Sequence, residues 1–266
     1  INSVRLRLPL LLKLIKEESP DVIALQETKV PDPLFPEEEI KKAGYPYLHY
    51  HGMKGYNGVA VLSKIPFEAR DIHHRCEKED CRHIAVKFKF PGFDRPAELH
   101  NLYIPAGGDE PDPEINDKFA HKLAFVEEMV EWFSSLYTPD APLIVVGDFN
   151  IAPLANDVWS HKQLLNTVCH TPAETGRLKR MQDTLNWTDS VRRFIPEDQK
   201  AYTWWSYRNR DWKKSDRGRR LDHIWVTKPL AEHLENHSIL RHARDWPQPS
   251  DHVPVSIRLK IPLTSI

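Results

Sequence analysis

Four separate segments of the sequence each place an acidic residue or a histidine at the end of a short apolar run or inside one. Carboxylate oxygens gathered from several strands form a set of hard ligands, which suits Mg²⁺ or Mn²⁺ better than zinc. The pattern therefore predicts a divalent-metal site that is assembled across a β-sheet. The residues concerned are, in chain order, Glu27, Asp148 with Asn150, Asp222, and Asp251 with His252.

The segment 141–150 is the clearest of the four. Its apolar run, Leu143 to Val146, is expected to be a buried strand, and the run stops at Gly-Asp-x-Asn. Side chains two residues apart on an extended chain point the same way, so Asp148 and Asn150 should converge on one site. The same residue types are also typical of a plain turn, and local chemistry alone leaves that alternative open.

The residue types in these segments favour hydrolysis of a phosphate ester. That reaction needs a metal to neutralise phosphoryl charge, a base to orient water, and a donor to the developing oxyanion. We expect Glu27 to bind the metal and Asp148 to activate water. Asp222 should orient His252 and raise its pKa, so that the imidazole donates to a phosphate oxygen. A structural histidine is the alternative for His252. A serine nucleophile is not indicated, since no G-x-S-x-G elbow is present.

The segment 200–228 is locally basic. The net charge of −1 argues against a general nucleic-acid binder, yet this segment holds nine Lys and Arg residues against three Asp. Basic groups interleaved with aromatic rings combine phosphate attraction with stacking surfaces. We therefore favour a nucleic-acid surface over a solvated charged loop. The aromatic residues are Tyr202, Trp204, Trp205, Tyr207 and Trp212.

The loop 54–58 presents a second cation and ring, Lys54 and Tyr56, between two glycines. An ordinary hairpin turn is favoured here because Asn-Gly is a strong turn signal, and a contact with a phosphate backbone is the alternative.

Length and composition predict one α/β domain covering residues 1–266, in the cytoplasm and without membrane contact. No apolar stretch approaches the roughly 20 residues that span a bilayer. No secretory leader is visible, although a chain that starts at Ile1 leaves an upstream leader open. Three cysteines cannot pair completely, which favours a reducing compartment. The spacing of Cys76 and Cys81 beside nearby histidines matches no common zinc pattern.

Helical and strand patterns alternate along the whole length, without a break in composition. Apolar residues from Phe119 to Phe133, for example, recur at helical spacing. We expect helices at 7–18, 37–42, 114–136, 154–165, 174–185 and 229–235. We expect strands at 22–25, 47–49, 58–63, 84–90, 97–103, 143–146 and 220–226, with the last strands after residue 235, one of them at 250–258.

Seven motifs together resemble the exonuclease III family, the apurinic/apyrimidinic endonucleases of the endonuclease/exonuclease/phosphatase superfamily. They are DVIALQETK at 21–29, KGYNGVA at 54–60, NLYIP at 101–105, VGDFNIAP at 146–153, YTWWSYR at 202–208, RGRRLDH at 217–223 and SDHVP at 250–254. The resemblance covers nearly the whole chain in the same order. It implies a four-layer α/β sandwich of two packed mixed sheets with outer helices, the DNase I-like fold.

The resemblance also implies an activity. Members are Mg²⁺-dependent repair nucleases that cut double-stranded DNA 5′ to abasic sites, often with 3′-5′ exonuclease and 3′-phosphatase activity. A bacterial member would act as a monomer in the cytoplasm, at the nucleoid.

Site roles follow from the same resemblance. Glu27 and Asp251 would be metal-site acids beside Asp148, which with Asn150 handles the attacking water and the phosphate, while Asp222 and His252 form the acid–histidine pair. The residues that would contact DNA are Tyr103 at the phosphate, Lys118 or Lys122 beside it, Trp204 as an aromatic wall against a base-less sugar, and Leu221 in the lining of that pocket.

Two features depart from the family pattern. Family members begin with a strand that ends in a metal-site Asn; here the chain starts at Ile1, and Asn2 matches a later Asn of that motif. Arg219 stands where some relatives carry a bulky apolar residue, and an Arg there could reach a DNA groove. The alternatives are therefore a phosphatase of the same superfamily acting on other phosphoesters, and a DNA-binding remnant that lost catalysis with its first strand.

Overall fold

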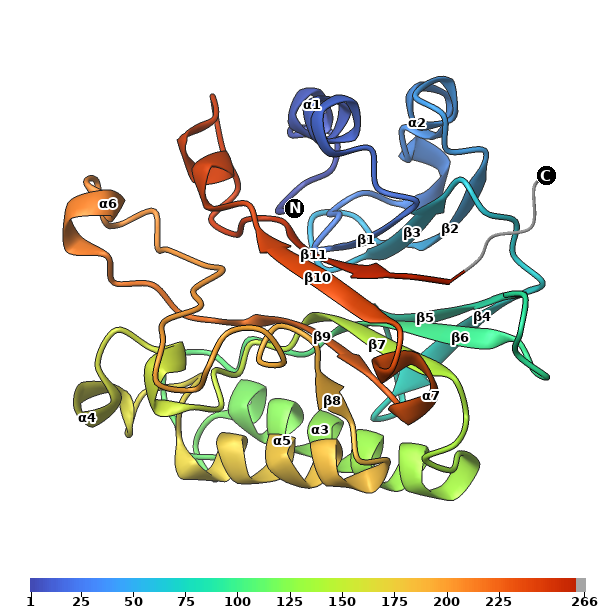
Figure 1. Cartoon of the computed structure of the whole chain (residues 1–266). Coiled ribbons are helices and arrows are strands. Elements are labelled where there is room, and N and C mark those ends of the chain that lie inside the picture. The colour runs from blue at the N-terminus through green and yellow to red at the C-terminus, as the bar shows by residue number, and fades with distance from the viewer. Residues whose placement is uncertain (262–266) are drawn as a thin grey trace.

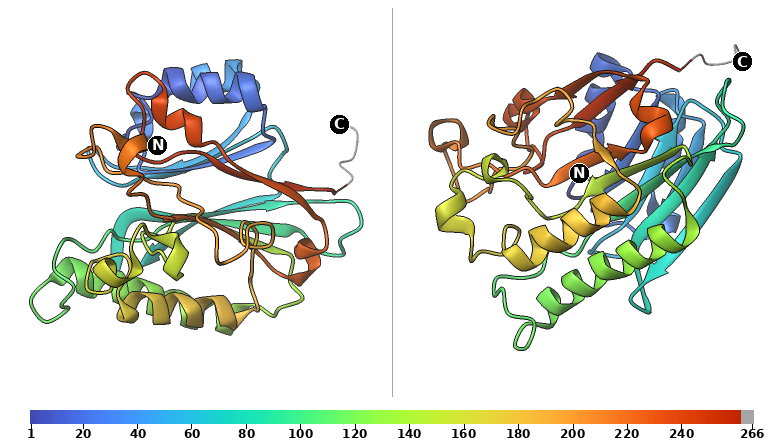
Figure 2. Two further views of the ribbon diagram at one scale, coloured as in Figure 1. Left: turned by 60° about the vertical axis from the view of Figure 1, so that its left-hand side comes forward. Right: turned by 60° about the horizontal axis from the view of Figure 1, so that its bottom comes forward.

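The computed structural model describes residues 1–261 and arranges them in four layers, with helices outside two layers of strands (Figures 1 and 2). This confirms the predicted α/β sandwich. The outer helices are α1 (Leu8–Glu18) and α2 (Glu37–Lys42) on one side, and α3 (Asp117–Leu136) and α5 (Pro172–Thr184) on the other. Within residues 1–261, none of the helices combines the length and apolar character needed to cross a bilayer.

The two strand layers differ in size. The larger sheet has six strands in the order β4-β5-β6-β7-β9-β8, with β6 and β7 parallel and joined by the crossover helix α3. Its strands are β4 (Ala69–Arg75), β5 (Lys78–Phe88), β6 (Ala97–Tyr103), β7 (Leu143–Asp148), β8 (Thr188–Asp189) and β9 (Asp222–Val226). The smaller layer holds the sheet β1-β3-β2 and the ladder β10-β11, which are β1 (Val22–Gln26), β2 (Tyr47–His51), β3 (Val59–Ser63), β10 (Leu234–Ile239) and β11 (Val255–Leu259).

The central strand β7 is buried on both faces because each face packs on a different core. Ile144 and Val146 join the core between the two strand layers, while Leu143 and Val145 join the core beneath α3 and α5. Alternating side chains of one strand thus serve two cores, which explains the uninterrupted apolar run of this segment. A third core under α1 and α2 contains Leu11, Ile15, Leu25, Ile40 and Leu62.

Most predicted elements are confirmed, and two predicted helices are wrong. The segment 154–165 forms only the 3-10 turn η2 (Ala155–Asp157) and the single turn α4 (His161–Leu164). The Asp157 side chain accepts from the backbone of Leu154 and pairs with Arg220, which holds this segment as a loop. The predicted helix 229–235 is only the turn α7 (Lys228–Ala231), because Leu234 already pairs in β10.

Strand β4 was not predicted from the sequence. Its residues are mostly exposed and lack an apolar alternation, so the strand depends on its pairing with β5. The remaining short elements are η1 (Asp32–Leu34), α6 (Trp212–Ser215) and η3 (Arg241–Asp245).

Glycine at position 147 is required by the close approach of β7 to β6. Gly147 has a φ of +147°, and a Cβ atom there would lie 1.8 Å from the carbonyl oxygen of Leu102, its register partner. Any larger residue must therefore push the two strands apart.

We expect Gly147→Ala to lower the free energy of unfolding by about 3 kcal/mol or more, since strand separation breaks the core on both faces of β7. Urea denaturation checks this. The matched control is Gly176→Ala in α5, where an added Cβ meets nothing within 4 Å; it should be neutral or stabilise by about 0.5–1 kcal/mol. Wild-type stability of the Gly147 variant would contradict the steric argument.

Candidate catalytic site

Strand register places three predicted site residues in one row. Tyr103 at the end of β6 lies opposite Asp148 at the end of β7, and Asp148 lies opposite Asp222 at the start of β9. Directly paired residues project to the same face of a sheet. The row therefore presents a phenol and two carboxylates at one edge of the central sheet.

His252 joins this row from the loop before β11. Its Nδ1 atom lies 2.9 Å from Oδ2 of Asp222, and its Nε2 atom lies 3.6 Å from Oδ2 of Asp148. The hydroxyl of Thr203 donates a hydrogen bond to Asp222 Oδ2 at 2.6 Å and accepts one from the backbone N–H of Asp222 at 3.2 Å. The imidazole is thus held between two carboxylates, one of which is itself fixed.

Burial and neighbouring charges both shift the pKa values of His252 and Asp148. Burial opposes protonation of His252, but the carboxylates of Asp222 and Asp148 outweigh it and raise its pKa to about 10. Burial, assisted by the charges of Asp222 and Glu27, raises the pKa of Asp148 to about 7, although His252 acts against it. His252 therefore carries a proton at neutral pH, and Asp148 is a base poised near neutrality.

Glu27 and Asp251 come close to Asp148 and His252 from other segments. Glu27 follows β1 and pairs with Lys29 at 3.0 Å; Lys29 Nζ also donates to Asn2, whose amide donates to Asp251 Oδ1 at 3.2 Å. Burial raises the pKa of Tyr103, and the charges of Glu27, Asp148 and Asp251 raise it further. These three carboxylates therefore lie near enough to Tyr103 for their charges to act on its hydroxyl.

The donor set fits a hard divalent cation. Asp148, Asp222 and His252 offer ligand atoms that lie within 4.8 Å of one another, and the acids Glu27 and Asp251 adjoin them. Carboxylate oxygens dominate, which favours a cation such as Mg²⁺ over softer metals. Because these carboxylates lie close together, a divalent ion would relieve their mutual repulsion.

Asn150 orients Asp148. Its backbone N–H donates to Asp148 Oδ1 at 2.9 Å, and its side-chain amide donates to Asp148 Oδ2 at 3.2 Å and to the carbonyl of Ile104 at 2.9 Å. Asn150 adopts a φ of +51°, a backbone conformation that Asn tolerates better than most residues. The segment is thus a tight turn, as in the turn alternative, and this turn brings the side chains of Asp148 and Asn150 together.

The prediction that Lys122 contacts DNA is wrong. Its side chain is fully buried, pairs with the buried carboxylate of Glu174, and donates to the carbonyls of Asn150 at 2.7 Å and Ala106 at 3.2 Å. It braces the loop after β7 and presents no charge to a ligand. Lys118, one turn earlier in α3, is exposed and can contact DNA.

Lys54 and Tyr56 lie on the surface beside Glu27. The loop that carries them is anchored by backbone bonds from Thr28 to Gly58 and from Lys29 to Asn57. Tyr56 is 72% exposed, an unusual position for a large ring. The loop therefore connects β2 to β3 and leaves both side chains exposed.

Only part of the basic, aromatic segment faces solvent. Arg220 is fully buried and makes a bidentate contact with Asp157, at 2.7 and 2.9 Å, and a further bond to Asp189 at 2.7 Å. Its charge is therefore structural, and the count of basic residues overstated the charge available to a ligand. Among the aromatic residues, Tyr202, Trp205 and Trp212 form a small core, while Tyr207 is exposed.

Trp204 is the aromatic residue of this segment that adjoins the acids. Its indole N–H donates to Asp251 Oδ2 at 3.0 Å, and its backbone forms a bridge with His252. Leu221 is buried beneath it in an apolar cluster with Val158 and Cys169. The half-buried indole and this cluster form an apolar wall next to the carboxylates.

Two residues that support the site, Thr203 and Asn101, were not predicted from the sequence. Thr203, which fixes Asp222, lies within a motif but carries no local signal of that contact. The side chain of Asn101 accepts a hydrogen bond from the side-chain amide of Gln26 at 2.6 Å and donates to the carbonyls of Leu25 and Ala60. These contacts link the two strand layers near the site. Asn101 is one of several polar residues in β6, beside Glu98 and His100, so no local signal singled it out.

A second group of potential metal ligands, His73, His83 and His100, lies away from the site. Arg75 Nε donates to His83 Nδ1 at 3.0 Å, so His83 Nε2 carries the proton directed at His100 Nδ1, 3.1 Å away. Burial lowers the pKa of both buried histidines well below the usual value. Both ring nitrogens of His83 are thus engaged, whereas within residues 1–261 Nε2 of His73 and Nε2 of His100 are buried without a hydrogen-bond partner.

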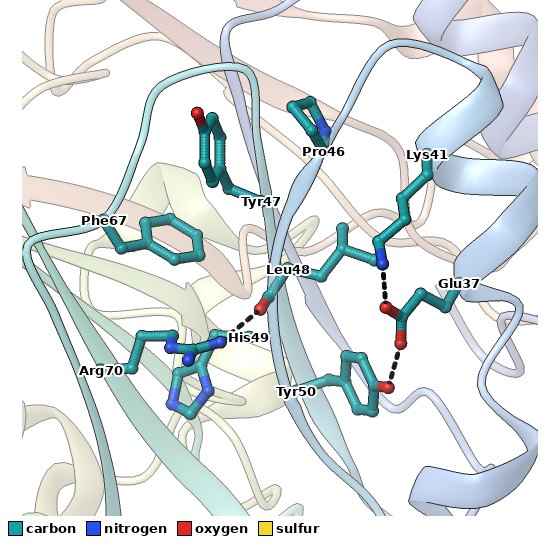
Figure 3. A pocket seen from close by; sticks show the side chains of 9 residues that line it. All are labelled: Glu37, Lys41, Pro46, Tyr47, Leu48, His49, Tyr50, Phe67 and Arg70. Atoms are coloured by element: carbon teal, nitrogen blue, oxygen red, sulfur yellow. Dashed lines mark hydrogen bonds and ion pairs between the residues drawn. The ribbon is translucent and has the colours of Figure 1, made fainter.

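The pocket in Figure 3 is also separate from the site. It has a volume of about 420 Å³ and is lined by residues of α2, β2 and the start of β4. Tyr50 donates to Glu37, which also pairs with Lys41, and Arg70 donates to the carbonyl of Leu48 at 3.4 Å. Its charged groups are already partnered, and its lining includes no predicted site residue.

Comparisons with known proteins agree with this geometry. Residues 4–252 match the model of the endonuclease/exonuclease/phosphatase family. The chain is 30% identical to exodeoxyribonuclease III of Haemophilus influenzae, over 98% of this chain and 97% of that protein. An AP endonuclease from Archaeoglobus fulgidus has a TM-score of 0.89 and 30% identity, covering 98% of this chain and 96% of that one. A 3′ phosphatase from Neisseria, bound to a product DNA hairpin, has a TM-score of 0.88 and 27% identity, covering 98% and 96%.

The buried Arg220–Asp157 pair makes stability depend on pH. Burial opposes ionisation of Asp157, but Arg220 and Arg192 lower its pKa to about 2, below the ordinary value of 3.8. Its charge therefore stabilises the fold above the ordinary pKa, and this contribution is lost as the pH falls through about 2.

We expect Asp157→Asn to destabilise the protein by about 3–5 kcal/mol at neutral pH, because Arg220 is left buried with an incomplete partner. The difference from wild type should shrink as the pH falls below about 4, measured by urea denaturation at several pH values. Asp183→Asn breaks an exposed pair with Lys179 and serves as the control, with little expected effect. A difference that stays constant with pH would argue against an ionised Asp157.

Proposed function

Because the chain belongs to the endonuclease/exonuclease/phosphatase family, we propose that it is a metal-dependent DNA-repair phosphodiesterase of the exonuclease III type. It is a phosphoric ester hydrolase that cleaves 5′ to abasic sites, or removes 3′-terminal nucleotides and 3′ blocking groups. The observation that carries this proposal is the placement of His252 between Asp222 and Asp148, at the edge of the sheet where Glu27 and Asp251 also gather. Residues 1–266 act as one catalytic domain in this proposal.

The acids would hold the cation, and Mg²⁺ or Mn²⁺ is the metal that we propose. Glu27 and Asp251, with Asp148 beside them, would be its ligands, since the charges of all three act on Tyr103. When bound, the cation would neutralise charge on the phosphoryl group, and it would also lower the pKa of nearby acids.

The chain's own residues would carry the proton transfers. Asp148, held by Asn150, would accept a proton from the attacking water. His252 carries a proton at neutral pH and would donate to a phosphate oxygen, while Asp222 keeps the imidazole oriented. The raised pKa of Tyr103 keeps its hydroxyl protonated, so that it would donate to the phosphate as well.

Double-stranded DNA with abasic sites or 3′ ends is the proposed substrate, bound by a monomer in the cytoplasm. Lys54, Tyr56 and Lys118 supply exposed groups around the acids. Trp204 and Leu221 supply an apolar wall against which a sugar could lie.

Incubation of the protein with an abasic duplex and with a duplex that carries a 3′-phosphate should give cleavage or phosphate release with Mg²⁺, and neither with a chelator. Asp148→Asn and His252→Ala should each lower kcat by about 10²–10⁴ without loss of folded structure, because each removes a proton-transfer group. The control is Glu131→Gln on the exposed face of α3, which should leave kcat unchanged.

Turnover of an inositol phosphate or lipid phosphate in place of DNA would instead support the non-DNA phosphatase. DNA binding without turnover would support the catalytically impaired remnant. Unchanged cleavage by the folded Asp148 or His252 variants would overturn the assigned roles.

A further inference from the structure

We propose that Arg219 sets the choice of DNA substrate at this site, favouring a 3′-terminal phosphate over an internal abasic nucleotide. The inference rests on the proposed function and adds a specificity-determining residue to it. Two neighbouring arginines differ in this respect: the fold neutralises the charge of Arg220, whereas that of Arg219 has no carboxylate partner within residues 1–261.

Arg219 is fixed next to the catalytic group by its backbone. Its N–H donates to the carbonyl of Trp204 at 2.9 Å, and the N–H of Trp204 donates back at 3.0 Å. Trp204 in turn bridges to His252 on its other side, and Arg219 also bridges to Val158. The segment of Trp204 thus lies between Arg219 and His252, the residue proposed to donate a proton to the phosphate.

The side chain of Arg219 lies across the apolar wall. Its guanidinium is 5.2 Å from the centroid of the Trp204 ring, and Nη1 lies 3.1 Å from the sulfur of Cys169. Cys169 and Leu221 belong to the apolar cluster beneath. A sugar that entered against Trp204 would have to displace the guanidinium from the ring, which weakens the binding of an abasic nucleotide.

The charge of Arg219 has no counterion in the fold. Arg220 is paired with Asp157 and Asp189, whereas within residues 1–261 no carboxylate pairs with Arg219. Its Nε atom is buried without a hydrogen-bond partner in that part of the chain, and a thiol is a weak acceptor. A cation in this state is completed by an anion that arrives from solvent.

A terminal phosphate monoester is the anion that best suits this position. At neutral pH it carries more charge than a diester and has three free oxygens, which match the planar fork of a guanidinium. An internal abasic site offers a singly charged diester and an uncharged sugar. Arg219 therefore adds attraction for the first substrate and an obstacle for the second.

The test compares kcat/KM for a 3′-phosphate duplex and for an abasic duplex, with Mg²⁺, in wild type and in Arg219→Ala. We expect the ratio of the two values, phosphate to abasic, to fall by about tenfold or more in the variant, the effect of one charged bidentate contact. Arg219→Gln keeps a planar polar group without the charge, and it should move the ratio the same way by a smaller factor.

Arg217→Ala is the matched control, because Arg217 belongs to the same segment and its guanidinium stacks 4.7 Å from the ring of a different tryptophan, Trp159. Its loss should lower both kcat/KM values equally and leave their ratio unchanged. An unchanged ratio in folded Arg219→Ala overturns the inference, and if that variant fails to fold by circular dichroism, an unchanged ratio in Arg219→Gln does so. Wild-type protein inactive on both duplexes would refute the proposed function instead.

Discussion

The approach of β7 to β6 at Gly147 is the constraint on which the candidate site depends. The missing side chain lets the two strands stay paired up to their last residues, so Tyr103 and Asp148 end in the same row. β9 extends that row with Asp222, and Asp222 in turn holds His252. A wider spacing of the strands at Gly147 would therefore misplace Asp148, and with it Asp222 and His252.

Electrostatics explains why this arrangement calls for a cation. Several carboxylates converge where burial already raises the pKa of Asp148, and His252 offsets only part of their repulsion. The supporting ion pairs, Lys122 with Glu174 and Arg220 with Asp157, hold the surrounding loops in place as matched charges. Because each such pair is neutral, the loops are held in place without cancelling the negative charge of the acids at the site.

The sequence predicted the elements and site residues whose signals are local. The apolar run of β7 and its polar end, like the helical spacing in α3, can be read without knowledge of distant contacts. Lys122 and Arg220 could not be placed in the same way, because their burial depends on Glu174 and Asp157, which only the tertiary fold brings to them. Strand β4 escaped for a related reason, since its partner rather than its own pattern stabilises it.

Arg219 and Arg220 show how one local rule separates a structural cation from a functional one. Successive side chains of an extended segment point to opposite sides. Arg220 therefore turns inward to Asp157, while Arg219 turns outward across Trp204. A count of charges over the segment treats the two alike. The groups on each side make the difference. The side of Arg220 supplies the carboxylates of Asp157 and Asp189, whereas the side of Arg219 supplies the ring of Trp204 and the thiol of Cys169.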